Sequence, residues 1–593
     1  MEPTARPRPH VGVRARTIRV VVALLVLAAS CTPPAPQEPP DPMPEPVPDT
    51  SEGSAAEEDA PPDPPDDDEE DGAQEEGAEQ EDGAEQEDAP EPEPALGAHG
   101  VSAGDPAAVA AGMEVLAAGG NAVDAAIATA FAVSVVEPFA SGIGGGGAAL
   151  VIRAAGEPLA YDYREVVPAD GRLPANDTGV PGFVAGMAEL HADHGTLDLA
   201  DLLEPAVRLA RDGTETSATV AAQLRSAAYR LPVDQLPHLY PDGQPLDAGE
   251  QMVQQELADT LQELATTGLD GFYDGAPAER LAAAVTGIDR ASLAGYDIQR
   301  STPPSGRFAG LEVVGAAPPL PGVALIQLLQ VAEALGVASS PPGTADHLHD
   351  LGLAWRTAER AVATELGDPE FVDVPVDTLT DQERNQVLAE EIDAEQALAL
   401  ASAGGGRSGN TTHLTVVDAD GTMVSMTNTL TNFWGTGQEV DGYFLNNQLS
   451  RFSIGSGGAN VPEAGRRSVS WSLPAMVLDD AGRPILGLGS PGGRRIPMIL
   501  AQVLVRWALH DQTLEEAVAA PRFHLEGREL QFESLPAEDV VAALGRRGYS
   551  SRSVPELPYY FGSVQALEID HDTGEVRGAR DERRDAAFEV ASP

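Results

Sequence analysis

The sequence predicts an α+β fold, with helices concentrated in the first part of the chain and strands in the second. Segments with helical periodicity dominate between residues 105 and 366, whereas strand-like segments gather after residue 410. The two kinds of segment do not alternate as βαβ units would. A Gly/Ser-rich stretch at 401–408, ASAGGGRS, separates the two regions. With 593 residues, of which 42% are hydrophobic, the chain can bury a large core.

The N-terminal residues 1–31 are expected to be an export signal. Five arginines lie between Arg6 and Arg19, and an apolar run from Val20 to Ala29 is too short for a membrane span. Small residues precede Cys31, the chain's single cysteine, which favours a bacterial lipoprotein signal with Cys31 lipidated. The alternative is an ordinary secretory signal. We therefore expect a periplasmic or cell-surface protein, attached to a membrane only through this lipid.

Residues 32–96 read as a disordered linker. This segment contains no Lys or Arg, and 25 Asp and Glu residues lie between Glu38 and Glu93, nearly half of the net charge of −58. Proline and acid without aromatic residues predict an extended chain, either a tether or an unselected linker. The remaining chain is also acidic and has no basic patch, which argues against nucleic acid as a partner.

The folded part begins near Gly97. Two helices separated by Gly119 and Gly120 are predicted within 105–138, and the glycine-rich segment 141–156 leads into a strand. Further helices are predicted in 179–213 (two), 254–280, 323–334 and 345–366. Strands are predicted at 412–418, 422–429, 441–445, 474–479, 484–488 and 563–570.

The first two of these strands form a predicted hairpin around the turn sequence DADG. A polar run, Asn410–Thr411–Thr412–His413, stands directly before the alternating part of the first strand, which begins at Leu414. If the chain is cut after Asn410, Thr411 gains a free α-amine with a pKa near ~7.7–8.0, which can take the proton of its own hydroxyl. The flexible stretch before this point would make the cut accessible. The alternative from the pattern alone is an ordinary strand start.

Other chemistry has weaker support in the sequence. There is no GxxxxGK[ST], HExxH, GxSxG or Cys/His cluster, so no metal site is predicted. Of two GxGxxG matches, the one at 142–147 is followed by a strand, and the one at 487–492 lacks a convincing ribose-binding acid.

Many stretches, in order, give the chain a strong resemblance to γ-glutamyltransferases of the N-terminal-nucleophile hydrolase superfamily. They include GGNAVDAAIATAFAVSVVEPFASGIGGGG (119–147), YREVVP (163–168), GVPGFVAG (179–186), LGDPEFVDVP (366–375), TTHLTVVDADGTMVSMTNTL (411–430), LNNQ (445–448), GSPGG (489–493) and DERRD (581–585). Together these and similar stretches cover nearly all of 97–593.

The resemblance implies a precursor that cuts itself into a large part, 97–410, and a small part, 411–593, which assemble into one four-layer αββα sandwich without a metal or organic cofactor. It implies Thr411 as nucleophile, oriented by Thr429. It implies Gly492 and Gly493 as the oxyanion-hole donors, a role that suits close backbone approach. Arg164 and Ser470 match residues that hold the substrate α-carboxylate, and Gln448 matches one that holds the α-amine.

Three positions depart from the family pattern. Trp471 replaces the second serine of the carboxylate-binding pair, Thr431 replaces an Asn of the amine site, and Arg451 replaces its Asp. A cationic amine beside Arg451 would meet repulsion where the family offers attraction. This leaves open a glutaryl-type acyl group, as used by cephalosporin acylases, beside the γ-glutamyl group.

The segment between Phe452 and Arg466 is shorter than in family members with a lid over the acyl pocket. A short segment predicts easier entry of water, and hence hydrolysis over transfer to an amino acid or peptide. The expected function is therefore a self-cleaving γ-glutamyl amidohydrolase/acyltransferase resembling glutathione hydrolase. A non-catalytic binding protein that keeps the fold is the alternative from another class.

Overall fold

The computed structural model describes residues 96–154, 156–399, 410–453, 458–554 and 559–593. The expected signal segment with Cys31, the linker up to residue 95 and the Gly/Ser stretch 401–408 lie outside the described residues. Among the described helices, none is both long enough and apolar enough to cross a membrane.

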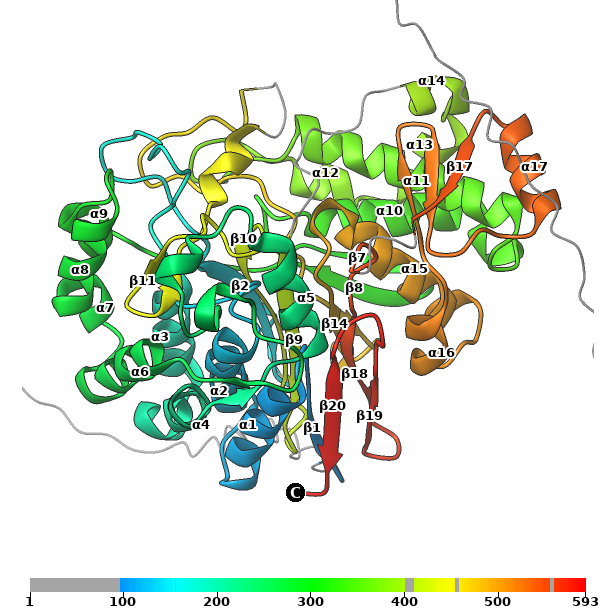
Figure 1. Ribbon diagram of the computed structural model, residues 1–593. Helices are drawn as coiled ribbons and strands as arrows, with labels where there is room; N and C mark the ends of the chain where they lie inside the picture. The colour runs from blue at the N-terminus through cyan, green and yellow to red at the C-terminus, as the bar shows by residue number, and fades with distance from the viewer. Residues whose placement is uncertain (1–95, 155, 400–409, 454–457, 555–558) are drawn as a thin grey trace, which may run out of the picture. The chain divides into compact units, whose positions relative to one another are not determined.

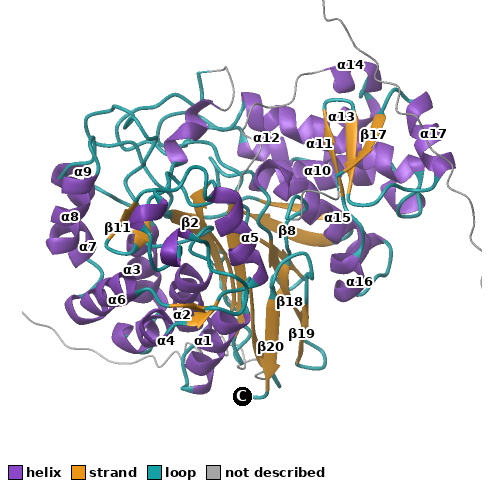
Figure 2. Ribbon diagram, in the orientation of Figure 1, coloured by secondary structure: helices purple, strands orange, loops and turns teal. Residues whose placement is uncertain are grey.

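Two antiparallel sheets form the centre of the fold (Figure 2). In spatial order, the first sheet contains β20 (Ala587–Ala591), β1 (His99–Ala103), β9 (Asn410–Val417), β10 (Met423–Thr431), β2 (Gly146–Ile152), β3 (Leu159–Asp162) and β6 (Gln299–Ser301). The second contains β19 (Glu575–Ala579), β18 (Gln565–Asp570), β14 (Pro484–Gly489), β13 (Ala475–Leu478), β8 (Leu311–Gly315) and β7 (Ser305–Phe308).

The two sheets pack against each other through one face each. Alternate residues of a strand point to opposite faces, and on β9 Val417 lies in the apolar cluster between the sheets while Leu414 and Val416 lie in the cluster under the helices. Thr411 and His413 share the face of Val417 by this alternation. Thr412 shares the opposite, helix-covered face.

Helices cover the outer face of each sheet (Figure 1). Those of the first sheet are α1 (Pro106–Ala117), α2 (Ala122–Val136), α3 (Phe183–His194), α4 (Leu199–Asp212), α6 (Gln255–Thr267), α7 (Gly271–Asp274), α8 (Ala276–Ala284) and α9 (Arg290–Ala294). Those of the second are α10 (Gly322–Ala334), α11 (Ala345–Thr364), α12 (Val376–Thr380), α13 (Gln382–Glu390), α14 (Ala394–Ala399), α15 (Ile496–Leu509), α16 (Leu514–Ala519) and α17 (Glu538–Arg546).

Smaller elements complete the fold. They are α5 (Ala218–Ala227), a small sheet of β15 (Phe523–Glu526), β16 (Glu529–Phe532) and β17 (Ser550–Ser553), and the pairs β4 (Thr214–Glu215) with β5 (Gln251–Met252) and β11 (Glu439–Val440) with β12 (Tyr443–Phe444). The four-layer αββα sandwich is confirmed.

The structure changes the expected division of the chain into a helical and a strand-rich part. Segments before residue 410 supply β1, β2, β3 and β6 to the first sheet and β7 and β8 to the second. The predicted helix at 254–280 is three helices, and the predicted strand at 441–445 is the second arm of the short β11–β12 pair. The two sides of the expected cut therefore build both sheets together.

Candidate active site

The hairpin of β9 and β10 brings the two expected catalytic threonines together. Thr411 and Thr429 are directly opposite each other in the antiparallel register. The Thr411 hydroxyl lies 3.4 Å from Oγ1 of Thr429, and both residues are buried. Their side chains point into the space between the two sheets, where backbone and side-chain dipoles act with little screening by water.

The hairpin is irregular next to this pair. Asn410 is opposite Thr431, and a bulge separates Thr429 from Thr431. The backbone N–H of Thr431 donates a 2.8 Å hydrogen bond to Oγ1 of Thr429. Thr431 has a φ of 80°, in the left-handed region that β-branched residues rarely adopt. A bulge commonly redirects a side chain beside an active site, and this one lies across from the Asn410–Thr411 peptide bond.

From the bulge, a chain of hydrogen bonds leads across the site to Arg164. The hydroxyl of Thr431 donates to Oε1 of Gln448, and Nε2 of Gln448 donates to Oγ of Ser468 over 3.0 Å. Arg164 donates from Nη1 to the Ser468 carbonyl over 2.7 Å, and its Nε and Nη2 form a two-pronged ion pair with Asp162. The structure therefore brings together Thr411, Thr429, Thr431, Gln448 and Arg164.

On the helix-covered face, Thr412 connects the nucleophile strand to a buried acid, Glu137. Its hydroxyl donates to Oε2 of Glu137 over 2.6 Å. Burial raises the pKa of Glu137, while the nearby Arg584 guanidinium lowers it. Arg584 in turn donates from Nη1 to the carbonyl oxygen of Thr411, over 3.4 Å. A cationic side chain is therefore hydrogen-bonded to the backbone carbonyl of the candidate nucleophile.

Between the sheets, His413 sits two residues along the strand from Thr411. Nδ1 of His413 lies 2.8 Å from Oγ1 of Thr427, and its Nε2 lies 3.2 Å from Oγ1 of Thr415. Burial lowers the pKa of His413 to about 3, so the ring is neutral at neutral pH. Hydroxyl groups can donate or accept, so they satisfy either tautomer.

The expected oxyanion donors follow strand β14. Gly492 and Gly493 have φ values of 145° and 58° and precede α15. A short 3-10 helix, Gly493–Arg495, connects them to α15. Glycine adopts such φ values without steric cost. The backbone N–H groups at the start of a helix have no partner within the helix, so they favour a negative charge near them.

The remaining expected site residues are buried. Ser470 is buried beside Trp471, whose ring centre lies 6.2 Å from that of Trp355 in the core over the second sheet. Trp471 thus packs with core residues, and its Nε1 has no hydrogen-bond partner in the described part of the chain. Arg451 is also buried, its Nε is unpartnered among the described residues, and burial lowers its pKa to about 10.

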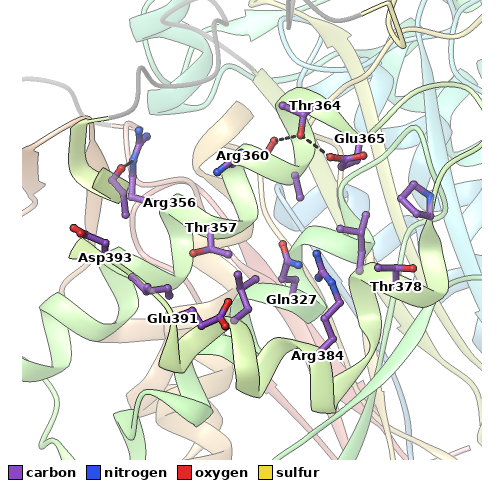
Figure 3. A pocket seen from close by; sticks show the side chains of 16 residues that line it. Gln327, Arg356, Thr357, Arg360, Thr364, Glu365, Thr378, Arg384, Glu391 and Asp393 are labelled. Atoms are coloured by element: carbon purple, nitrogen blue, oxygen red, sulfur yellow. Dashed lines mark hydrogen bonds between the residues drawn. The ribbon is translucent and has the colours of Figure 1, made fainter. Parts of the chain in front are cut away.

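A separate cavity of about 540 Å³ lies among the helices over the second sheet (Figure 3). Its lining includes Arg360 and Thr364 of α11 and Arg384 of α13. Figure 3 shows the Thr364 hydroxyl bonded to the Arg360 carbonyl and to the Glu365 carboxylate. The threonine pair lies on the first sheet instead. No cluster of three metal-ligating side chains occurs among the described residues.

Comparison with known proteins identifies the family. The gamma-glutamyltranspeptidase family profile matches residues 108–591. This chain belongs to the γ-glutamyltranspeptidase family. It is 37% identical to the capsule biosynthesis protein CapD proenzyme of Bacillus anthracis over 83% of this chain and 90% of that protein. It is 32% identical to the glutathione hydrolase proenzyme of Escherichia coli over 82% of this chain and 90% of that one.

Among solved structures, the chain is similar to a cephalosporin acylase from Bacillus halodurans. The TM-score is 0.76 at 27% identity, covering 84% of this chain and 96% of that one. The family and its N-terminal-nucleophile hydrolase fold are thus shown, whereas these relatives carry three different activities in their names. Acyl specificity must therefore be argued from the residues of this chain.

Sequence reasoning missed several residues around the threonine pair. Glu137, Asp162 and Arg584 come from segments distant in sequence, and their partners became visible only in the fold. For two of them the sequence did contain a signal. Asp162 lies in YDYREVVP and Arg584 in DERRD, where charged residues interrupt otherwise apolar or turn-like stretches. Buried charged residues of this kind are rare unless they are paired.

Proposed function

We propose that this protein is a self-cleaving γ-glutamyl amidohydrolase/acyltransferase that acts through an acyl-enzyme on Thr411. The observation that carries the proposal is the buried hydroxyl pair of Thr411 and Thr429 at the bulged end of the hairpin. Relatives named as proenzymes support a chain that matures by cleavage.

Maturation would begin with attack of the Thr411 hydroxyl oxygen on the carbonyl carbon of Asn410. The C–N bond breaks as a C–O bond forms, which leaves an ester and a free Thr411 α-amine. Water then hydrolyses the ester, releasing the Asn410 carboxylate and restoring the hydroxyl. Thr429 is placed to hydrogen-bond the attacking oxygen, and Arg584 holds the Thr411 carbonyl.

In the mature protein, the Thr411 α-amine accepts the proton of its hydroxyl as the oxygen attacks the substrate amide carbonyl. The N–H groups of Gly492 and Gly493 are the proposed donors to the developing oxyanion. Collapse of this intermediate expels the amine, which takes the proton from the α-ammonium. Water or an acceptor amine then attacks the acyl-enzyme. The short segment between Phe452 and Arg466 favours water in this last step.

The substrate α-carboxylate is assigned to Arg164 and Ser470. Three N–H groups of Arg164 are used within the protein, by Asp162 and the Ser468 carbonyl, and two of its five remain. A planar guanidinium that is fixed by hydrogen bonds to two neighbours is well suited to bind a carboxylate through its remaining N–H groups. Gln448 and Thr431 are assigned to the α-amine of the same acyl group.

A glutaryl-type amidase is the second candidate, and Arg451 is the observation that favours it. This arginine is buried without an ion-pair partner among the described residues, so a substrate carboxylate would compensate its charge. The fold similarity to a cephalosporin acylase is compatible with such a substrate.

Gel analysis and two chromogenic substrates test these proposals. Purified protein should yield two fragments, with Thr411 at the new N-terminus, and should release nitroaniline from γ-glutamyl-p-nitroanilide. Thr411→Ala should remain one chain and be inactive, whereas Thr411→Ser, which keeps a hydroxyl, should still cleave itself. Faster turnover of glutaryl-p-nitroanilide would favour the second candidate. An uncut, inactive wild-type protein would indicate a binding protein and contradict both enzymatic proposals.

Export and lipidation at Cys31 remain part of the proposal. Incorporation of radiolabelled palmitate in a bacterial host should occur in the wild-type protein and disappear in Cys31→Ser. A secreted protein that takes up no label would support an ordinary signal peptide instead.

A further inference from the structure

The cavity over the second sheet contains a buried hydrogen-bond acceptor that the described residues leave without a partner. Gln327 of α10 lines this cavity and is 1% exposed. Its Oε1 has no hydrogen-bond partner among the described residues. A buried polar atom left unpaired costs free energy, and each one calls for an explanation such as a bound ligand or water molecule.

A network of amide groups fixes the orientation of Gln327. Nε2 of Gln330 donates to two backbone carbonyl oxygens, so the Oε1 of this residue must be an acceptor. Nδ2 of Asn385 donates to that oxygen and to the Leu379 carbonyl. Nε2 of Gln327 then donates to Oδ1 of Asn385 over 3.1 Å. Because a carbonyl oxygen can only accept, none of these amides can be turned round, and Oε1 of Gln327 stays an unpaired acceptor.

A cationic donor lies directly beside this acceptor. Nη1 of Arg384 donates to the same Oδ1 of Asn385, over 3.2 Å. Figure 3 shows the Gln327 and Arg384 side chains next to each other in the lining of the cavity. The α-ammonium and α-carboxylate of an amino acid share one carbon atom. An acceptor and a guanidinium that are neighbours therefore match both charged groups of one amino-acid headgroup.

The other charges of the lining favour a zwitterion. Arg360 of α11 also lines the cavity, and its guanidinium has no partner among the residues that the structure describes. Glu365 and Glu391 line it as well, and neither forms an ion pair within that part of the chain. Two arginines and two glutamates without ion-pair partners balance each other. Such a lining disfavours a phosphate or another polyanion, which would need an excess of positive charge.

The cavity is larger than a headgroup requires, and part of its lining is apolar. Its volume of about 540 Å³ lies in the range of small-molecule sites, roughly 300–1,000 Å³. Leu379, Leu388 and Ile392 supply the apolar part. An apolar side chain of the ligand can be removed from water against these residues.

We propose that this cavity binds a free α-amino acid with an apolar side chain. Arg384 binds the α-carboxylate, and Oε1 of Gln327 accepts a hydrogen bond from the α-ammonium. The site lies among the helices over the second sheet, whereas Thr411 lies on the first sheet. The inference therefore goes beyond the proposed function and does not depend on it.

Isothermal titration calorimetry of the mature wild-type protein tests the ligand class. L-leucine should bind with a Kd below about 1 mM. N-acetyl-L-leucine lacks the ammonium group, L-leucinamide lacks the carboxylate, and L-alanine lacks the long side chain. Each of these three should bind at least about tenfold more weakly, the effect of losing one charged contact or one large apolar contact.

Two variants locate the binding event. Gln327→Met keeps the length of the side chain and removes the acceptor, and Arg384→Met removes the cation. Each should weaken L-leucine binding by about tenfold or more, while kcat for γ-glutamyl-p-nitroanilide changes by less than about twofold. Arg290→Met, at an exposed arginine of α9, is the matched control and should leave binding unchanged. If Gln327→Met does not fold, Arg384→Met, at an exposed position, decides the question.

Three outcomes overturn the inference. Absence of L-leucine binding would leave Oε1 of Gln327 to a water molecule. Equal binding of L-leucine and N-acetyl-L-leucine would refute an ammonium site. Equal binding of L-leucine by the wild-type protein and by Arg384→Met would place the ligand elsewhere on the protein, for example beside Thr411. Because binding is measured without turnover, an inactive wild-type protein would contradict the proposed function and leave this inference testable.

Discussion

The imidazole of His413 packs directly onto the α-carbon of Gly489. A Cβ on Gly489 would lie 2.2 Å from Nδ1 and 2.3 Å from Cε1 of the ring, so only glycine fits there. His413 belongs to the strand that carries Thr411, and Gly489 ends the strand that leads to Gly492 and Gly493. The ring therefore sets the spacing between the candidate nucleophile and the candidate oxyanion donors.

This contact predicts that Gly489→Ala lowers kcat by about tenfold or more while KM changes little, since a displacement of about 1 Å can lower rates strongly. The added methyl group should also cost about 1–3 kcal/mol of stability. In the double variant Gly489→Ala/His413→Ala, the space left by the ring accepts the methyl group, so part of the stability should return. Kinetics and denaturant unfolding of Gly489→Ala, His413→Ala and the double variant measure this. Strictly additive losses would contradict a direct contact between the two positions.

A second prediction concerns the left-handed backbone of Thr431. Left-handed geometry costs roughly 1–2 kcal/mol for most residues, and asparagine tolerates it better than threonine. Thr431→Asn should therefore raise the free energy of unfolding by about 1 kcal/mol. It also keeps a polar group that can reach Gln448, which accepts from the threonine hydroxyl in the wild-type protein.

The matched control for this change is Thr431→Ala, which removes the hydroxyl but retains a Cβ and its steric cost. It should be no more stable than the wild-type protein in the same thermal unfolding experiment. A gain for alanine equal to that for asparagine would show that the φ value of 80° is not the source of the cost.

The sequence predicted the hairpin well because its signals are local. Alternation from Leu414 and the DADG turn define the register that places Thr411 opposite Thr429. The strand His99–Ala103 was missed because it is buried along its whole length and shows no alternation. Long-range partners were missed for a different reason. The contact of Glu137 with Thr412 joins residues 275 positions apart, and no local pattern encodes such a pairing.

A third prediction follows from Asp105, the N-cap of α1, which is largely buried near Glu137 and Asp585. Burial and these two acids raise its pKa to about 7, although the N–H of Ala107 opposes this. Between about pH 4 and pH 7 the folded protein thus binds a proton that the unfolded chain has released. This contribution is fully present below pH 4 and is lost as the pH rises through 7.

Asp105→Asn keeps the cap, because asparagine is an equally good N-cap residue. The variant lacks the titrating group, so between pH 4 and pH 8 it should gain about 4 kcal/mol of stability relative to the wild-type protein, since a shift of about three pKa units corresponds to about 1.4 kcal/mol per unit. Urea unfolding at the two pH values measures this difference. Asp247→Asn, at a highly exposed position, is the control. A wild-type-to-variant difference that is constant with pH would contradict the assigned pKa.

The last prediction concerns the buried cation at Arg451. Since burial lowers the pKa of this arginine to about 10 and no partner compensates it among the described residues, Arg451→Met should stabilise the mature protein by about 1–3 kcal/mol. The same change should lower the ratio of glutaryl to γ-glutamyl hydrolysis, because it removes the positive charge that attracts a carboxylate and repels an amine. Arg451→Lys keeps the charge and should preserve the ratio. A stabilised methionine variant with an unchanged ratio would place Arg451 outside the acyl pocket, whereas a loss of stability would reveal a compensating partner.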